Sequence, residues 1–203
     1  MLDLTPAERK IFKSLNTPSK IQDFLNRLPF NFEQDGEGLM SPRRVLQAGT
    51  AHCLEGAMLA AAALWLQGHK PLLMDFKTLP IDEEHVVALF KQNGYWGAIS
   101  KTNHAILRYR DAIYKTPHEL AISYFNEYFD FKTGEKTLRS YSAPFDLSKL
   151  GEEWVTASHD LWEVDKLLDK SPHFKMVTPT QARRLRPVEK IELEAGKLTE
   201  WKR

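Results

Sequence analysis

Residues 49–69 read GTAHCLEGAMLAAAALWLQGH and hold the only cysteine of the chain, Cys53, at the start of an almost wholly apolar run. The pattern predicts a helix over 51–66, with Thr50 as its N-cap and a glycine just beyond its end. Glu55 is the one charged residue between the cysteine and the end of that helix. Because a helix that is apolar all round is buried on most sides, it should form the centre of the core.

The position of Cys53 allows two interpretations. Free N–H groups and the helix dipole stabilise an anion at a helix N-terminus, so a thiol there can be an activated thiolate. A lone cysteine is also a common buried core residue that does no chemistry. A nucleophile needs a base, and His85 opens the apolar segment HVVALF. We expect its ring at the end of a sheet, where it can lean over the start of the helix.

The rest of the chain predicts short helices before this segment and strands after it. Thr5, Thr17 and Ser41 each precede a proline and should begin helices. KPLLMDF is typical of a buried strand, HVVALFKQNGYWGAIS of a hairpin turning at Asn93, and AILRYR of a further strand. TPHELAISYFNEYFD predicts a helix capped by Thr116, with core aromatic residues. SHDLWEVDKLLDK predicts an amphipathic helix, and RRLRPVEKIELEAGKLTEWKR a mobile tail or a partner-docking segment.

The composition narrows the classes of function. The net charge is +1 over 203 residues, which gives no reason to expect nucleic acid or an acidic membrane surface as a partner. One cysteine cannot form an internal disulfide, and the N-terminal residues lack the basic and then apolar profile of a signal peptide. The longest apolar run, 57–66, is too short to cross a bilayer. We therefore expect a soluble, cytoplasmic protein.

The segment SPRRVLQAGTAHCLEGAMLAAAALWLQGHKPLLMDF, followed by HVVALFKQNGYWGAIS, resembles the core of the transglutaminase-like superfamily. The resemblance covers about 41–102, and more loosely the whole chain is similar to small uncharacterised bacterial members. It implies an α+β, papain-like fold in which the cysteine helix packs on an antiparallel sheet beginning near Lys70. It also implies that Cys53 is the nucleophile and His85 the general base. No cofactor and no metal are implied by this chemistry.

The resemblance also suggests how the chain is divided. Residues 1–40 would form an N-terminal helical layer of the same domain. Residues 41–142 would be the transglutaminase-like core, and 143–203 a C-terminal helical or extended segment.

One position departs from the family pattern. Pairing through the Asn-Gly turn sets His85 opposite Thr102 and makes Ser100 its diagonal neighbour on the same face, where the family has an aspartate. A serine hydroxyl can accept a hydrogen bond from the imidazole but brings no negative charge. Asn103 is a second candidate to orient the ring, because papain-like proteases use an asparagine for this. The acidic residues beside the histidine, Asp82 and Glu84, are further candidates.

Other polar residues near the cysteine have simpler interpretations. Glu55 is favoured as a carboxylate that complements the helix dipole. His52 would point to another side of the helix and serve as a capping or surface residue. A metal site built from His52, Cys53 and His85 lacks the ligand spacing of a known zinc motif.

These observations lead to two hypotheses of function. The first is a thiol-dependent amide-bond hydrolase or acyl transferase in which Cys53 attacks a carbonyl, His85 transfers the proton, and Ser100 or Asn103 orients the ring. The second is a catalytically silent domain that binds a peptide or protein partner in the same cleft, which the missing aspartate favours. Both imply a peptide or protein as substrate or partner. The identity of the substrate and the oligomeric state are not encoded in these motifs.

Overall fold

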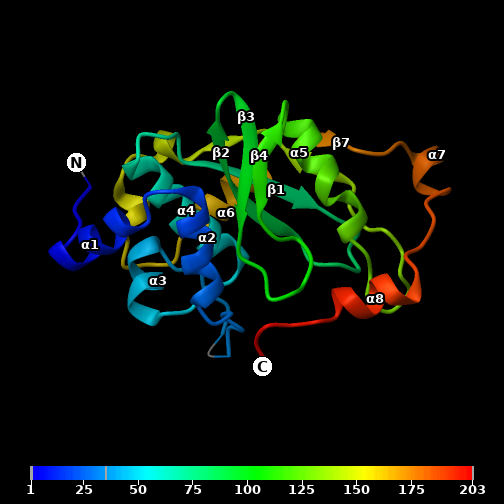
Figure 1. The fold of residues 1–203 in the computed structure, drawn as a ribbon, viewed down its shortest axis with the longest axis horizontal. Coiled ribbons are helices and arrows are strands. Elements are labelled where there is room, and N and C mark those ends of the chain that lie inside the picture. The colour runs from blue at the N-terminus through cyan, green and yellow to red at the C-terminus, as the bar shows by residue number, and fades with distance from the viewer. Residues whose placement is uncertain (1, 35, 203) are drawn as a thin grey trace.

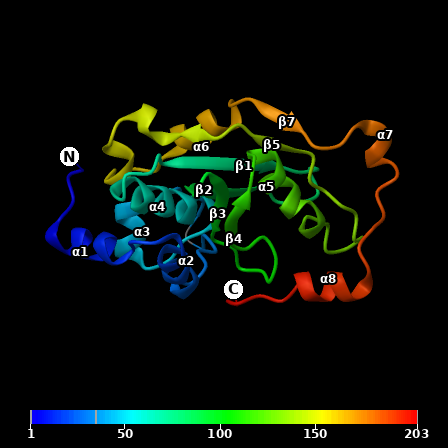
Figure 2. The same cartoon turned by 45° about the horizontal axis from the view of Figure 1, so that its top comes forward.

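The computed structural model describes residues 2–34 and 36–202 and shows a mixed α+β protein with an antiparallel sheet. In Figures 1 and 2, α1–α4 lie toward one end of the molecule and α7 and α8 at the other, with the sheet and α5 between them. The α-helices are α1 (Pro6–Ser14), α2 (Pro18–Arg27), α3 (Pro42–Ala48), α4 (Cys53–Leu66), α5 (Pro117–Tyr124), α6 (Trp162–Asp169), α7 (Pro179–Ala182) and α8 (Lys190–Gly196). Three short 3₁₀ helices are η1 (Phe125–Glu127), η2 (Leu147–Leu150) and η3 (Glu153–Val155).

The sheet has the strand order β4-β3-β2-β1-β5-β7, and β6 also pairs with β1. All of the pairings between these strands are antiparallel. The strands are β1 (Leu72–Lys77), β2 (His85–Gln92), β3 (Tyr95–Ser100), β4 (Arg110–Tyr114), β5 (Ser140–Ser142), β6 (Phe145–Asp146) and β7 (His173–Lys175). The order places β1 and β2 centrally, so the first residue of β2 lies in the interior of the fold.

The hairpin of β2 and β3 has the predicted register. Asn93 and the glycine after it have positive φ angles of 51° and 86°, as a two-residue hairpin turn requires. Gln92 pairs with Tyr95, and Val87 pairs with Ser100 at the other end of the ladder. The count along the hairpin therefore brings Ser100 beside the first residue of β2.

The two faces of the sheet contact different groups of side chains. Val86, Ala88 and Phe90 of β2 belong to the core cluster that contains α4, whereas Val87 and Leu89 belong to the cluster that contains α5. This alternation follows from the two-residue period of a strand. The sheet is thus buried on both faces, with α4 covering one of them.

The expected helix starts are present, with one correction at α4. Thr5, Thr17 and Ser41 accept hydrogen bonds from backbone N–H groups at the starts of α1, α2 and α3. The N-cap of α4 is His52 rather than Thr50, so the helix begins two residues later than predicted. The reason is that Ala51 pairs with Phe30 in a parallel bridge and is held in extended conformation.

Later in the chain the sequence predictions are less accurate. The strand expected over AILRYR begins only at Arg110, the last residue of that segment, and α5 ends at Tyr124. The short strands β5, β6 and β7 have no counterpart in the predictions. The charged C-terminal segment forms α8 and then returns to the body of the protein, where Thr199 bridges His104. Among the described residues, no helix combines the length and the apolar character needed to cross a membrane.

Candidate active site

Cys53 is the first residue of α4. The helix is buried on every side from Leu54 to Leu64, whereas Cys53 is partly exposed. The N–H groups of a first helical turn have no partner within the helix, and their partial positive charge favours an anion beside them. The sulfur therefore lies where a thiolate is stabilised and where a ligand can reach it.

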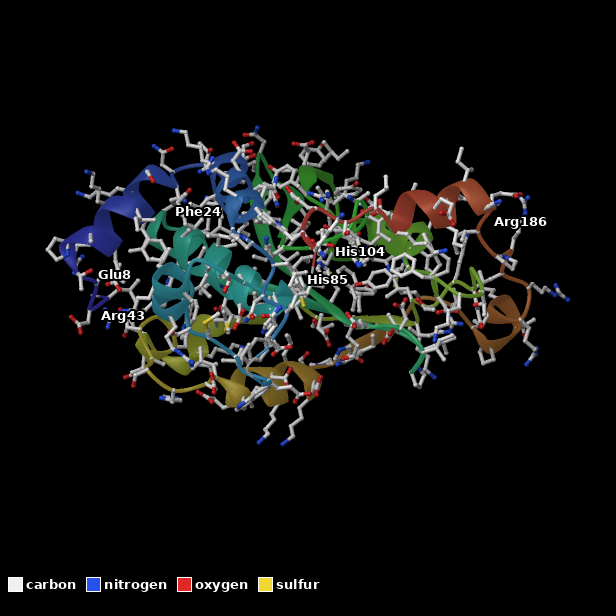
Figure 3. The ribbon with its side chains drawn as sticks, turned by 90° about the horizontal axis from the view of Figure 1, so that it is seen from below. Glu8, Phe24, Arg43, His85, His104 and Arg186 are labelled. Atoms are coloured by element: carbon white, nitrogen blue, oxygen red, sulfur yellow. The ribbon has the colours of Figure 1, made fainter. Side chains whose placement is uncertain are left out.

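Two imidazoles, those of His52 and His85, hydrogen-bond the sulfur of Cys53. Burial by itself raises the pKa of the thiol. The hydrogen bonds and the positive charge of the two rings outweigh burial and lower the pKa to about 6. Figure 3 shows His85 near the middle of the molecule, where the N-terminal helices meet the strands. Because its pKa is about 6, the side chain of Cys53 is a thiolate at neutral pH.

The pKa of His52 moves in the opposite direction. Burial lowers it, but the hydrogen bond to Cys53, the charge of the thiolate and the carboxylates of Glu55 and Glu33 raise it to about 9. Between about pH 6 and about pH 9 the site therefore contains a thiolate–imidazolium pair. The prediction that His52 points to another side of the helix is wrong, because its backbone is extended at the N-cap and directs the ring toward the sulfur.

The ring of His85 is oriented by a serine. Its Nε2 atom lies 2.8 Å from the Oγ of Ser100. The hydroxyl of Ser100 donates its own proton to the carbonyl of Leu107, so its oxygen accepts the Nε2–H of the ring. This network assigns the tautomer and leaves Nδ1 as the nitrogen that faces Cys53.

Ser100 is itself held by a glutamine of α2. The amide of Gln22 donates to the carbonyl of Ser100 at 2.8 Å and accepts from its N–H at 2.9 Å. Both residues are buried, so these bonds are sheltered from competition with water. Gln22 thus fixes the backbone whose side chain orients His85. We call the set of His85, Ser100 and Gln22 the sheet end.

A close approach between β3 and α4 joins the sheet end to the start of the helix. Gly56 lies one turn after Cys53, and a Cβ at this position would clash with the Cβ and Cγ of Lys101. The ammonium of Lys101 passes the helix and donates to the carbonyls of Leu25 and Leu28, at the end of α2. Burial lowers the pKa of this lysine to about 8. Glycine is needed here because the side chain of Lys101, the residue after β3, packs directly against the helix at this position.

On the other side of the sulfur a buried carboxylate organises the start of α4. Glu55 is fully buried and accepts hydrogen bonds from the N–H groups of His52 and Met40, each at 2.9 Å, and from the side chain of Asn31 at 3.1 Å. Its Oε1 atom lies 3.5 Å from the ring Nε2 of His52. We call the set of His52, Glu55, Asn31 and Met40 the helix cap.

Two cavities meet at Cys53. The larger is a groove of about 820 Å³ that contains the sulfur, both imidazoles and the aromatic residues Phe30, Phe32, Phe129 and Phe131 along its walls. The smaller is a pocket of about 240 Å³ behind the sulfur, which His52 and Cys53 also line. The groove is large enough for an extended peptide segment, and Cys53 is part of its lining.

Three carboxylates line the smaller pocket. Among the described residues, they are the one group of carboxylate, imidazole or thiol side chains that lie close enough together to share a cation. Asp75, Glu84 and Asp169 bring their oxygens within 4.8 Å of one another. The ammonium of Lys77 bonds to all three and occupies the place that a cation would take. Burial lowers the pKa of Lys77, but the three carboxylates outweigh burial and raise it. These acids therefore form an ion-pair network around a lysine.

The other candidates to orient His85 bond elsewhere. The side-chain amide of Asn103 donates to the carbonyl of Trp201 and accepts from its N–H, so it holds the C-terminal segment rather than the ring. Asp82 accepts from Thr137, and Glu84 belongs to the lysine network. Of the residues proposed from the sequence, Cys53, His85 and Ser100 come together, and Asn103 does not join them.

The structure adds two residues that the sequence did not indicate as part of the site, His52 and Gln22. A signal for His52 was available, because Glu55 follows it by three residues, as in a capping box. No comparable signal exists for Gln22, whose contact with Ser100 spans 78 residues. The hydroxyl of Tyr128, in the groove wall, is buried and has no hydrogen-bond partner among the described residues.

A comparison with models of known protein families finds none that matches this chain, and a comparison with curated proteins finds no significant match.

Proposed function

We propose that this protein is a thiol-dependent enzyme that forms an acyl-enzyme at Cys53 and acts as an amide-bond hydrolase or acyl transferase. The observation that carries the proposal is the meeting of a low-pKa thiolate with the imidazole of His85 at the start of a buried helix, inside a groove. A thiolate held beside imidazoles is the working unit of acyl transfer through cysteine. Chemistry of this kind requires no cofactor.

The reaction has two steps. The thiolate of Cys53 attacks the carbonyl carbon of the substrate, the sulfur–carbon bond forms, and the electron pair of the carbonyl moves to its oxygen. Collapse of this oxyanion breaks the carbon–nitrogen bond, and the imidazolium of His85 gives its proton to the departing amine. Water or an acceptor amine then attacks the thioester, His85 takes the proton, and the thiolate leaves. N–H groups in the first turn of α4 are suited to stabilise the oxyanion.

The sequence resemblance to the transglutaminase-like superfamily supports the same assignment, with a papain-like arrangement of the helix and the sheet. The one departure is Ser100, which stands where the family has an aspartate. Its hydroxyl holds the ring of His85 in one orientation at 2.8 Å without adding charge. The aromatic walls and the size of the groove favour a peptide or protein as the substrate.

The test of an activated thiolate is alkylation by iodoacetamide across pH. With a pKa of about 6, about half of the thiol is ionised at pH 6, against about 0.1% for a thiol with the ordinary value of 9.0. A less basic thiolate is also a weaker nucleophile, which offsets part of this gain. We expect alkylation of the folded protein at pH 6 to be on the order of 20-fold faster than in urea. A rate that rises only above about pH 8 contradicts the proposal.

The test of the acyl-enzyme uses p-nitrophenyl acetate, which releases p-nitrophenolate when a nucleophile is acetylated. We expect a burst of product and a mass gain of one acetyl group on Cys53, both absent in Cys53→Ser. Loss of the acetyl group in water indicates a hydrolase, and faster loss on addition of a primary amine indicates a transferase. A protein that is not acetylated at Cys53 is not an enzyme of this class.

A second candidate function is supported by the neutral character of Ser100. Without a carboxylate behind His85, the same groove can bind a peptide or protein partner and perform no reaction. This function predicts that peptides bind the groove, that Cys53→Ser leaves their affinity unchanged, and that no acetyl-enzyme forms.

A further inference from the structure

The two imidazoles beside Cys53 are backed by different groups. The Nε2 atom of His52 lies 3.3 Å from the carbonyl oxygen of Gly38 and 3.5 Å from Oε1 of the buried carboxylate of Glu55. His85 has the neutral hydroxyl of Ser100 behind it, at 2.8 Å. A carboxylate stabilises the charged form of an imidazole, whereas a hydroxyl orients the ring without preferring the charged form strongly. The two rings are therefore suited to different tasks.

Anionic groups surround His52 on several sides. On its own element it faces the sulfur of Cys53 and Glu55; Glu33 acts on it from the loop before α3, and Asp165 from α6. Glu55 has none of its surface in contact with solvent, so the protein itself must balance its charge. A positive His52 satisfies both Glu55 and the thiolate.

The hydrogen bonds around His85 are compatible with transfer of a proton to and from its ring. Because Ser100 directs its own proton to Leu107, it accepts the Nε2–H of His85 whether the ring is neutral or charged. With Nε2 bonded to Ser100, the nitrogen left to contact the sulfur is Nδ1. Gln22 keeps Ser100 in place throughout, because it bonds both the N–H and the carbonyl of that residue.

We propose that the two imidazoles divide the work: His52, positioned by Glu55, supplies the fixed positive charge that keeps the sulfur of Cys53 ionised, and His85 carries the proton. This inference rests on the thiol-dependent function proposed above. It explains how the site operates with a serine behind His85, because the carboxylate of the site stands behind the other ring.

The proton balance of the cycle supports this division. In the resting enzyme the positive charge of His52 lies beside the thiolate of Cys53 and the buried side chain of Glu55. Acylation moves one proton from His85 to the departing amine, while His52 stays charged. Deacylation returns one proton to His85 from water or the acceptor amine, and the thiolate that departs is again paired with His52. The net reaction is amide plus water to acid plus amine, or amide plus acceptor amine to a new amide plus the departing amine.

The test compares His52→Gln with His85→Gln, since each replacement removes one imidazole and keeps a polar side chain. Alkylation by iodoacetamide reports the ionisation of Cys53, and acetylation followed by turnover of p-nitrophenyl acetate reports proton transfer. In His52→Gln we expect alkylation at pH 6 to fall on the order of 10-fold. In His85→Gln we expect a fall of less than about 3-fold, together with loss of turnover. Glu55→Gln should lower alkylation at pH 6 by less than His52→Gln does.

A fall in His85→Gln that equals or exceeds the fall in His52→Gln overturns the division of labour and leaves the acyl-enzyme proposal intact. Slow alkylation of the wild-type protein at pH 6 refutes the thiol function itself, and the two failures are thereby distinguished. If a variant does not fold, imidazole nitrogen NMR of the wild-type protein decides. One histidine ring should stay charged to about pH 9 and should lose that property in Cys53→Ser. A wild-type spectrum without such a ring overturns the inference.

Discussion

The helix cap and the sheet end each bring one imidazole to the same sulfur atom and are stabilised in different ways. The helix cap depends on charge, because the buried carboxylate of Glu55 accepts two backbone N–H groups and a side-chain amide while facing an imidazole. The sheet end depends on neutral hydrogen bonds, from Gln22 to Ser100 and from Ser100 to His85. A single carboxylate can both stabilise the charge of an imidazole and orient its ring. The contrast teaches that here Glu55 provides the charge, beside His52, and Ser100 provides the orientation, of His85.

The largest expected effect comes from removing the charge of the helix cap. Glu55→Ala leaves three partly buried donors without an acceptor, and a buried unpaired donor costs about 1–3 kcal/mol. We expect the free energy of unfolding to fall by about 4 kcal/mol, measured by urea denaturation. Glu37→Ala, which changes an exposed acid of the loop before α3, is the control and should change it little. A loss below about 1 kcal/mol for Glu55→Ala would show that the helix cap does not depend on this carboxylate.

A substitution of Gln22, in the sheet end, should lower the free energy of unfolding by less. Gln22→Leu removes the two bonds to the backbone of Ser100 and fills the space with an apolar side chain. We expect a loss of about 2 kcal/mol in the free energy of unfolding, because neutral groups are left unpaired. Acetylation of Cys53 should slow more than its alkylation, since the ring of His85 loses its orientation. The exposed Gln47→Leu serves as control, and equal effects of the two variants would contradict this role of Gln22.

The contact between the two regions can be tested at Gly56. An added methyl group favours a helix by about 1 kcal/mol, but it would clash with Lys101, and overpacking costs about 1–3 kcal/mol. We therefore expect Gly56→Ala to lower the free energy of unfolding by about 1.5 kcal/mol, measured by thermal unfolding. In the control Gly38→Ala the new Cβ meets Asp160 at 3.6 Å, an ordinary contact. Stabilisation by Gly56→Ala would mean that β3 and α4 are not in tight contact.

The smallest expected effect is an increase in the free energy of unfolding. The hydroxyl of Tyr128, a residue of the core cluster that contains α5, is buried without a partner among the described residues, and burial together with the charge of Cys53 raises its pKa. Tyr128→Phe removes this unpaired group and should raise the free energy of unfolding by about 1 kcal/mol, seen as a higher melting temperature. Tyr124→Phe is the matched control, because the hydroxyl of Tyr124 donates to Arg108 and its loss should destabilise. A lower melting temperature for Tyr128→Phe would mean that its hydroxyl stabilises the fold.

The parts of the site that the sequence predicted correctly depend on local rules. The start of a buried helix placed Cys53, and counting through an Asn-Gly turn brought Ser100 beside His85. A strand has a fixed period of two residues, so this count holds without knowledge of the rest of the fold. The helix starts at Thr5, Thr17 and Ser41, with their prolines, are signals of the same local kind.

The parts that the sequence missed depend on contacts between distant residues. The N-cap moved from Thr50 to His52 because Ala51 pairs with Phe30, and this shift turned the imidazole toward the sulfur. Asn103 appeared suited to orient His85, but the C-terminal segment occupies its amide. The strands β5, β6 and β7 are only two or three residues long, and they form because β1 and its neighbours offer partners. Periodicity cannot detect strands this short.

The contact between Asn103 and Trp201 joins residues 98 positions apart, whereas His52 and Cys53 are adjacent in the chain. Closing so long a loop costs more entropy than ordering neighbours, and such contacts open earlier when a protein fluctuates. The side of the groove at Asn103 can therefore open transiently while Cys53 and the imidazoles that bond its sulfur stay in place. In hydrogen exchange, the amide of Trp201 should lose protection well before those of α4, so that the shape of the groove is adjustable and the position of Cys53 is not.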